Sequence, residues 1–236
     1  MSSAALDPIE KKPLVDFYPG SLILSVGSYG CSLRCPFCQN HEISQQDLEG
    51  QCETVTPQQL VDKALSLVPY GNIGIAFTYN EPLIGYEFVR DSARLAKENG
   101  LKTVLVTSGN ASEKVLDELL PYIDAYNIDL KGFTDDYYRY VGGNLDMTKC
   151  FIEKAAKAAH VELTTLIVPG KTIPLRIWNA WPNGSLRFRR ISFCISVGIS
   201  PLSRKRRPYA DRNLEKTAEY CEEISENGRS RQRLTR

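Results

Sequence analysis

Long apolar runs, histidine and an export signal are all missing or scarce in this 236-residue sequence. No apolar stretch approaches the length of about 18 residues that indicates a membrane-spanning helix. The opening residues, MSSAALDPIEKKPL, lack the basic-then-apolar order of a secretory signal, so we expect a cytoplasmic protein. Only two histidines are present, His41 and His160, which leaves little room for catalysis by a histidine base.

Cysteine occurs in an odd number, seven, and only three of the seven lie close together. This distribution does not suit a disulfide framework and fits a reducing compartment better. The hydrophobic fraction of 42% and the charged fraction of 24% are ordinary for a globular protein. The length allows one large domain or two small ones.

Charge is nearly balanced overall, at +1, but it is unevenly distributed along the chain. Residues 1–170 hold 14 basic and 22 acidic side chains, a net charge of −8. Residues 171–236 hold 15 and 6, a net charge of +9, and 12 of those 15 basic residues are arginine. We therefore expect two regions, a core over residues 1–171 and an anomalous Arg-rich tail over residues 172–236.

The first 170 residues alternate between short apolar runs and patterns of helical spacing. The predicted strands are residues 21–26, 72–78, 101–108, 124–130 and 160–168. The predicted helices are residues 56–68, 85–100, 112–123 and 146–159, with Thr56 and Ser112 as N-caps and Pro57 at the first helical position. This alternation predicts an α/β fold with a parallel sheet and right-handed connections.

Polar loops follow the predicted strands at their carboxyl ends, where barrel-like and doubly wound folds place their sites. Beyond the cysteine-bearing loop after the first strand, these loops are TYNEP (78–82), TSGN (107–110), DLKG (129–132) and VPG (168–170). Their convergence on one rim predicts a single functional site.

The three clustered cysteines, Cys31, Cys35 and Cys38, form a C-x3-C-x2-C pattern just after the first predicted strand. Thiolates favour Zn²⁺ or an iron–sulfur cluster. A structural zinc site needs four ligands, and here His41 or Cys52 would have to complete it. A four-iron cluster held by three cysteines instead leaves one iron open to a substrate or cofactor. We favour the cluster, and a non-catalytic zinc-binding module is the alternative.

With Phe37 just before the last cysteine, this pattern resembles the signature of radical S-adenosylmethionine enzymes. The stretch CPFCQNHEIS resembles the pyruvate formate-lyase activating enzymes. The segments ALDPIEKKPL, TYNEP and NIDLKGFTDDYYRYVGG resemble the AmmeMemoRadiSam-system radical SAM enzyme. The resemblance runs from about Ala5 to Lys171, without the cysteine-bearing segment that the family usually has upstream. It implies a partial (β/α)6 barrel with an incomplete C-terminal part.

The resemblance also implies two cofactors, a [4Fe–4S] cluster and S-adenosylmethionine. The amino and carboxylate groups of S-adenosylmethionine would bind the open iron. One electron would then release methionine and a 5′-deoxyadenosyl radical that abstracts hydrogen from a substrate. The activase likeness implies a possible protein substrate, with a flavodoxin or ferredoxin as electron donor.

Four residues in the second and third loops are expected, from the resemblance, to bind S-adenosylmethionine. Asn80 and Glu81 would lie at its amino group, because a carboxylate attracts an ammonium ion. Ser108 and Asn110 would lie near its ribose, although the family more often reads TNG at this point. A helix cap and ordinary turn chemistry are the alternatives for these two loops.

The fourth loop contributes Asp129 and Lys131, which the resemblance places near the carboxylate and sulfonium of S-adenosylmethionine. Residues two apart on a strand point in the same direction, so both side chains can face the barrel mouth. A plain ion pair between them is the alternative.

The tail loses the strand and helix periodicity after Lys171. Its arginines and aromatic residues would suit phosphate contacts, but we disfavour a nucleic-acid-binding module. We interpret the tail as the product of a shifted reading frame, because a one-base step back from Thr172 permits codons for a family-like helix and strand. We therefore expect the sixth strand to be missing and the region from about residue 172 to be poorly ordered.

Overall fold

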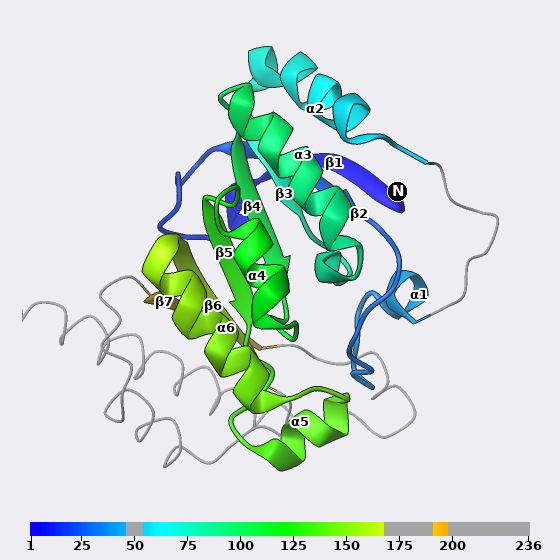
Figure 1. Cartoon of the computed structure of the whole chain (residues 1–236), viewed down its shortest axis with the longest axis vertical. Coiled ribbons are helices and arrows are strands. Elements are labelled where there is room, and N and C mark those ends of the chain that lie inside the picture. Colours follow the sequence, from blue (N-terminus) through cyan, green and yellow to red (C-terminus); the bar gives the residue numbers. More distant parts are fainter. Residues whose placement is uncertain (46–53, 168–190, 198–236) are drawn as a thin grey trace, which may run out of the picture. The chain divides into compact units, whose positions relative to one another are not determined.

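Seven strands form one sheet in the computed structural model, which describes residues 1–45, 54–167 and 191–197. All of these residues belong to a single unit, Met1–Gly198 (Figure 1). The strands are β1 (Ser3–Pro8), β2 (Leu22–Gly27), β3 (Asn72–Phe77), β4 (Lys102–Thr107), β5 (Ala125–Asp129), β6 (His160–Ile167) and β7 (Ile191–Val197). The α-helices are α1 (His41–Ser44), α2 (Pro57–Ser66), α3 (Tyr86–Glu98), α4 (Glu113–Leu119), α5 (Asp135–Val141) and α6 (Leu145–Ala158). Short 3₁₀ turns are η1 (Ile9–Lys11), η2 (Val68–Tyr70) and η3 (Pro82–Gly85).

The strands are ordered along the sheet as they are along the chain. β2 to β7 pair in parallel, and β1 pairs antiparallel with β2. The five predicted strands are confirmed as β2 to β6, with every boundary within one residue of the expected position. The expected fold class, a partial α/β barrel, is therefore confirmed.

Two strands of the structure differ from the expectations. β1 was not predicted, because SAALDP shows no apolar alternation and its first three residues are exposed. β7 pairs in parallel with β6 from Ile191 opposite Val161 onward, whereas the sixth parallel strand was expected to be missing. The remainder of the Arg-rich tail, the VPG loop and Cys52 lie outside the described residues.

The four predicted helices are confirmed as α2, α3, α4 and α6, while α5 was not predicted. Thr56 caps α2 through a capping box with Gln59, and Pro57 occupies the first turn. Ser112 stands at the N-cap position of α4, but its side chain makes no capping hydrogen bond. Across the described part of the chain, no helix has both the length and the apolar character needed to cross a bilayer.

Alternate residues of the strands divide the core into two layers. Leu24, Leu105 and Tyr126 pack with the larger hydrophobic cluster, which includes the apolar faces of α2, α3, α4 and α6. Their strand neighbours Ile23 and Val104 face the opposite side of the sheet, because successive strand side chains alternate. The helices therefore cover the outer face of the curved sheet, and another segment must cover the inner face.

The N-terminal segment, residues 9–17, covers the inner face. Its Ile9, Leu14 and Phe17 are buried there, at 0%, 0% and 9% exposure. Glu162 of β6, itself 0% exposed, accepts hydrogen bonds from the backbone N–H groups of Val15 and Asp16 at 2.8 and 3.0 Å. The segment thus packs on the inner face around Ile23, Val104 and Ala125, and the polar loops gather at the carboxyl-end rim.

Candidate functional site

The cysteine loop follows β2 and is held by backbone hydrogen bonds to other elements. The N–H of Arg34 donates to the carbonyl of Val141 at 2.8 Å, which ties the loop to the end of α5. The N–H of Cys38 donates to the carbonyl of Cys35 at 3.1 Å, and that of Leu33 approaches the Cys31 sulfur at 3.4 Å. The three thiols thus sit on a folded loop that the rest of the fold positions.

The loop buries its cysteines in a small apolar cluster with Leu33, Phe37, Tyr137 and Val141. Cys35 is 7% exposed. Burial raises the pKa of the Cys35 thiol to about 11; Lys131 opposes this rise, and Asp129 and the neighbouring thiols add to it. Metal binding at Cys35 must therefore displace a proton that burial holds on this thiol.

The donor set and its spacing fit an iron–sulfur cluster. Three soft thiol ligands on one loop suit iron and sulfide, and each would ligate a different iron of the cluster. In the described ranges, no three His, Cys, Asp or Glu side chains converge as the ligands of one metal ion do. Of the two candidates for a fourth zinc ligand, His41 is exposed and Cys52 is outside the described residues.

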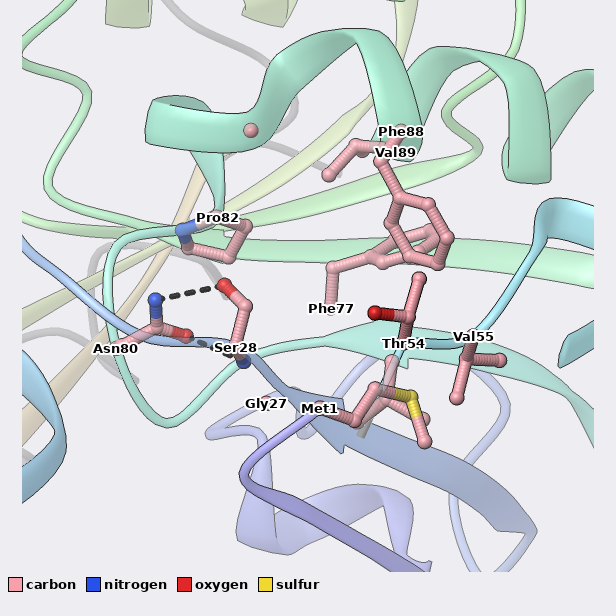
Figure 2. A pocket seen from close by; sticks show the side chains of 12 residues that line it. Met1, Gly27, Ser28, Thr54, Val55, Phe77, Asn80, Pro82, Phe88 and Val89 are labelled. Atoms are coloured by element: carbon pink, nitrogen blue, oxygen red, sulfur yellow. Dashed lines mark hydrogen bonds between the residues drawn. The ribbon is translucent and has the colours of Figure 1, made fainter. Parts of the chain in front are cut away.

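Asn80 holds the start of the cysteine loop. Its side-chain oxygen accepts the N–H of Ser28 at 3.0 Å, and its amide nitrogen donates to the Ser28 hydroxyl at 2.8 Å and to the Gly30 carbonyl at 3.0 Å. Figure 2 shows the Asn80 and Ser28 side chains facing each other beside Pro82. The structure thus uses every hydrogen-bonding atom of the Asn80 side chain to join the loop after β3 to the loop after β2.

Glu81 is a buried carboxylate, 3% exposed, that joins the loops after β3 and β4. One oxygen accepts the Thr107 hydroxyl at 2.6 Å and the Leu83 N–H at 3.2 Å. The other accepts the Ser108 N–H at 2.9 Å and the Ser108 hydroxyl at 2.6 Å. Four donors occupy the four acceptor positions that a carboxylate offers.

Asn110 lies farther along the same rim and bonds to the segment before α6. Its amide nitrogen donates to the Asn144 carbonyl at 2.8 Å and to the Thr148 hydroxyl at 3.2 Å. The side chains of Ser108 and Asn110, predicted together, therefore serve different neighbours. The Ser108 hydroxyl donates to Glu81 after β3 and accepts the Asn110 backbone N–H at 3.4 Å. The Asn110 side chain bonds toward α6.

Asp129 and Lys131 form an ion pair at the end of β5, as one reading of the sequence anticipated. Burial alone would lower the pKa of Lys131, but Asp129 and Cys35 outweigh it and raise that pKa above its ordinary value. The second carboxylate oxygen of Asp129 is buried and has no hydrogen-bond partner within the described residues. An acceptor of this kind, beside the cysteines, is available to a ligand that donates hydrogen bonds.

The predicted residues converge around the cysteine loop. Lys131 lowers, and Asp129 raises, the pKa of Cys35, while burial and then Glu81 raise the pKa of Cys31. Asn80 bonds directly to the same loop. Asn110 is the exception, because its side chain bonds toward α6 and not toward the cysteine loop.

Sequence reasoning missed three polar residues next to this site: Asp7, Lys12 and Tyr79. Lys12 is 2% exposed and bonds to Asp7, which also accepts the Tyr79 hydroxyl. Tyr79 has a φ of 75°, a conformation that side chains other than glycine rarely adopt. The position of Tyr79 within the rim loop TYNEP could have indicated that it lies near the site. Nothing in the neighbouring sequence distinguishes Lys12 from a solvent-exposed lysine.

A mostly apolar cavity of about 200 Å³ lies beside Asn80. Val26, Phe77, Phe88 and Val89 line it, together with Met1 (Figure 2). None of the three cysteines lines this cavity, so it is separate from the cluster of thiols.

Comparison with known proteins identifies the family to which the chain belongs. The model of the radical SAM superfamily matches residues 25–175. An uncharacterized protein of Methanocaldococcus jannaschii is 41% identical over 170 residues, covering 71% of this chain and 49% of that protein. The pyruvate formate-lyase 1-activating enzyme of Escherichia coli K12 is 30% identical over 151 residues, covering 60% of this chain and 59% of the enzyme. The chain thus spans about half to three fifths of the length of these relatives.

Solved structures agree on the fold. Streptococcus suis SuiB bound to S-adenosylmethionine matches with a TM-score of 0.64 at 12% identity, over 86% of this chain and 48% of SuiB. QueE from Escherichia coli matches with a TM-score of 0.56 at 13% identity, over 96% of this chain and 90% of QueE. The fold, the cysteine loop and the match to the family model lead to one conclusion: this chain belongs to the radical SAM superfamily, whose cofactors are a [4Fe–4S] cluster and S-adenosylmethionine.

Proposed function

We propose that this chain reductively cleaves S-adenosylmethionine and transfers the resulting radical to a partner, in the manner of the activating enzymes it is similar to. The observation that carries the proposal is the gathering of three thiols with Asp129 and Lys131 at the carboxyl end of the sheet. When bound, the cluster supplies the electron that yields methionine and a 5′-deoxyadenosyl radical. The likeness to pyruvate formate-lyase activating enzymes supports a protein as hydrogen donor. The proposal takes a flavodoxin or ferredoxin as the electron source.

Cys31, Cys35 and Cys38 would hold three irons and leave the fourth to S-adenosylmethionine. Burial of Cys35 among apolar side chains would keep water from the reacting bond. Lys131 would offer its ammonium to the carboxylate of S-adenosylmethionine, while the unpartnered oxygen of Asp129 would accept a hydrogen bond from the same molecule.

The remaining predicted residues would shape the pocket for S-adenosylmethionine. Asn80 fixes the start of the cysteine loop, and Glu81 fixes the loop that bears Ser108 and Asn110. A fifth donor at Glu81, such as the ammonium of S-adenosylmethionine, would have to share or replace one of the four present donors. Ser108 and Asn110 would approach the ribose from the same rim.

The test is S-adenosylmethionine cleavage after anaerobic reconstitution with iron and sulfide. Wild-type protein should turn brown and, with a chemical reductant, form 5′-deoxyadenosine that chromatography quantifies. Cys35→Ala should lose the cluster and the product, while Cys150→Ala, a change at an exposed free cysteine on α6, should retain both. A colourless protein that binds zinc instead would overturn the proposal in favour of a zinc-binding module.

A further inference from the structure

Asp7 of β1, Lys12 of the N-terminal segment and Tyr79 of the loop after β3 form a polar network in which Asp7 and Lys12 are buried. The Tyr79 hydroxyl donates to Asp7 at 2.7 Å, and Lys12 donates to the same carboxylate oxygen at 3.0 Å. The Lys12 ammonium also lies 4.5 Å from the centre of the Tyr79 ring. A lysine that is 2% exposed requires a charged partner, and Asp7 provides it.

This network holds Tyr79 in an unfavourable backbone conformation. Its φ of 75° lies in the left-handed region, where a side chain crowds the backbone. The ring packs against Gly27 at the end of β2 so closely that a Cβ on Gly27 would lie 3.0 Å from a ring carbon. Such a conformation persists only where surrounding contacts determine it, and Asp7, Lys12 and Gly27 supply those contacts.

The backbone around Tyr79 contacts the cysteine loop on both sides of its thiols. The Tyr79 carbonyl accepts the Asn40 side-chain amide at 2.6 Å, two residues after Cys38. The next residue, Asn80, bonds to Ser28 and Gly30, just before Cys31. The turn at Tyr79 therefore determines where both ends of the loop are attached.

We propose that Tyr79 is a positioning residue: through its bonds to Asp7 and Lys12, it fixes the turn that anchors both ends of the Cys31–Cys38 loop. Asp7 and Lys12 thereby control the geometry of the cysteine loop, although neither residue belongs to that loop. The inference rests on the proposed function only in taking this loop as the one that carries the cluster. The hydrogen bonds that link Asp7, Tyr79 and the loop involve no cysteine sulfur and do not require the metal.

Hydrogen exchange of the metal-free 236-residue chain tests the coupling. Tyr79→Phe keeps the ring and removes the hydroxyl that donates to Asp7. Exchange should therefore accelerate about tenfold in peptides covering residues 27–45 and stay unchanged in peptides covering β4 and β5. Tyr70→Phe, a change at a tyrosine that is 71% exposed, is the matched control and should have no effect.

Lys12→Met is the second variant. It removes the bond from Lys12 to Asp7 and leaves the Tyr79 side chain unchanged. It should also accelerate exchange over residues 27–45, whereas the exposed-site control Lys114→Met should not. A role for Lys12 in packing alone would accelerate exchange over residues 1–18 and spare residues 27–45. That pattern, or uniform acceleration across the sheet in both variants, would overturn the proposal.

The reconstituted protein gives an independent readout. Tyr79→Phe should retain its iron, since the three cysteines are intact, but should bind S-adenosylmethionine about tenfold more weakly and alter the electron paramagnetic resonance signal of the reduced cluster. Unchanged affinity and signal would count against the proposal. Absence of a cluster in the wild-type protein would refute the proposed function, and the exchange experiment would still decide the role of Tyr79.

Discussion

Glu81 accepts two hydrogen bonds from Ser108, one from its backbone N–H at 2.9 Å and one from its hydroxyl at 2.6 Å. The two residues lie in the loops that follow neighbouring parallel strands, β3 and β4. Both are buried, Glu81 at 3% and Ser108 at 6% exposure, so water does not compete for these bonds. One carboxylate therefore joins two loops of the rim.

Glu81→Gln should destabilise the protein by about 2 kcal/mol or more. The side-chain amide cannot accept at its nitrogen, so at least one of the buried donors from Thr107, Ser108 or Leu83 loses its partner. Denaturant unfolding would measure the loss. Glu87→Gln, at an exposed position on α3, should change the unfolding free energy by less than about 0.5 kcal/mol. Equal effects of the two variants would contradict this view of Glu81.

Asp7→Asn should produce a pH-dependent loss of stability. Burial raises the pKa of Asp7, but hydrogen bonds from Tyr79, Lys11 and Lys12 outweigh burial and hold that pKa well below its ordinary value. Ionised Asp7 therefore stabilises the fold at pH values above its unfolded pKa of about 3.9, and this contribution disappears as the pH falls through the lower, folded pKa.

The difference in unfolding free energy between wild type and Asp7→Asn should be constant from about pH 6 to pH 8 and narrow below about pH 4. Denaturant titrations across this range would show it. Asp62→Asn, at an exposed site on α2, should show no such trend. A difference that stays constant below pH 4 would mean that the charge of Asp7 does not contribute.

Gly143→Ala should push the turn between α5 and α6 away from the cysteine loop. A Cβ at this glycine would lie 2.7 Å from a methyl carbon of Leu33 and 3.2 Å from the Tyr138 ring. The crowding should lower the unfolding free energy by about 1–3 kcal/mol and reduce iron retention after reconstitution. Gly85→Ala meets no atom within 4 Å and should lose less than about 1 kcal/mol with full iron content.

Lys131→Met should weaken S-adenosylmethionine binding without loss of iron. Under the proposed function, the Lys131 ammonium makes a charge-assisted bond to the carboxylate of S-adenosylmethionine, so its removal should raise Kd about tenfold to a hundredfold. Calorimetry on anaerobically reconstituted protein would measure the change. Lys114→Met should bind as wild type does, and equal Kd values in both variants would remove Lys131 from the cofactor site.

The sheet was largely predictable, because its strands and helices alternate with distinct periods. β2 to β6 are short buried runs, and their hydrophobic pattern is strong. β1 is an edge strand whose side chains mostly face solvent, so pairing with β2 rather than composition defines it. α5 contains aspartates and tyrosines, and its helical face becomes evident only from the contacts of Tyr137, Tyr138 and Val141.

The site was predictable only where its chemistry is local in sequence. Three cysteines within eight residues predict a metal centre by themselves. The bond between Tyr79 and Asp7 spans 72 residues, and no local pattern predicts such a pairing. The adjacent lysines 11 and 12 look alike in the sequence, yet the side chain of one is 65% exposed and that of the other 2%.

The anchoring of the N-terminal segment to Glu162 has a consequence for biosynthesis. Val15 is translated 147 residues before the carboxylate that its N–H requires. During synthesis, Val15 and Asp16 leave the ribosome long before β6 exists to offer the Glu162 carboxylate to their N–H groups. A nascent chain interrupted before β6 would lack this anchor, and the segment that carries Leu14 and Phe17 would be open to chaperones and proteases until β6 is made.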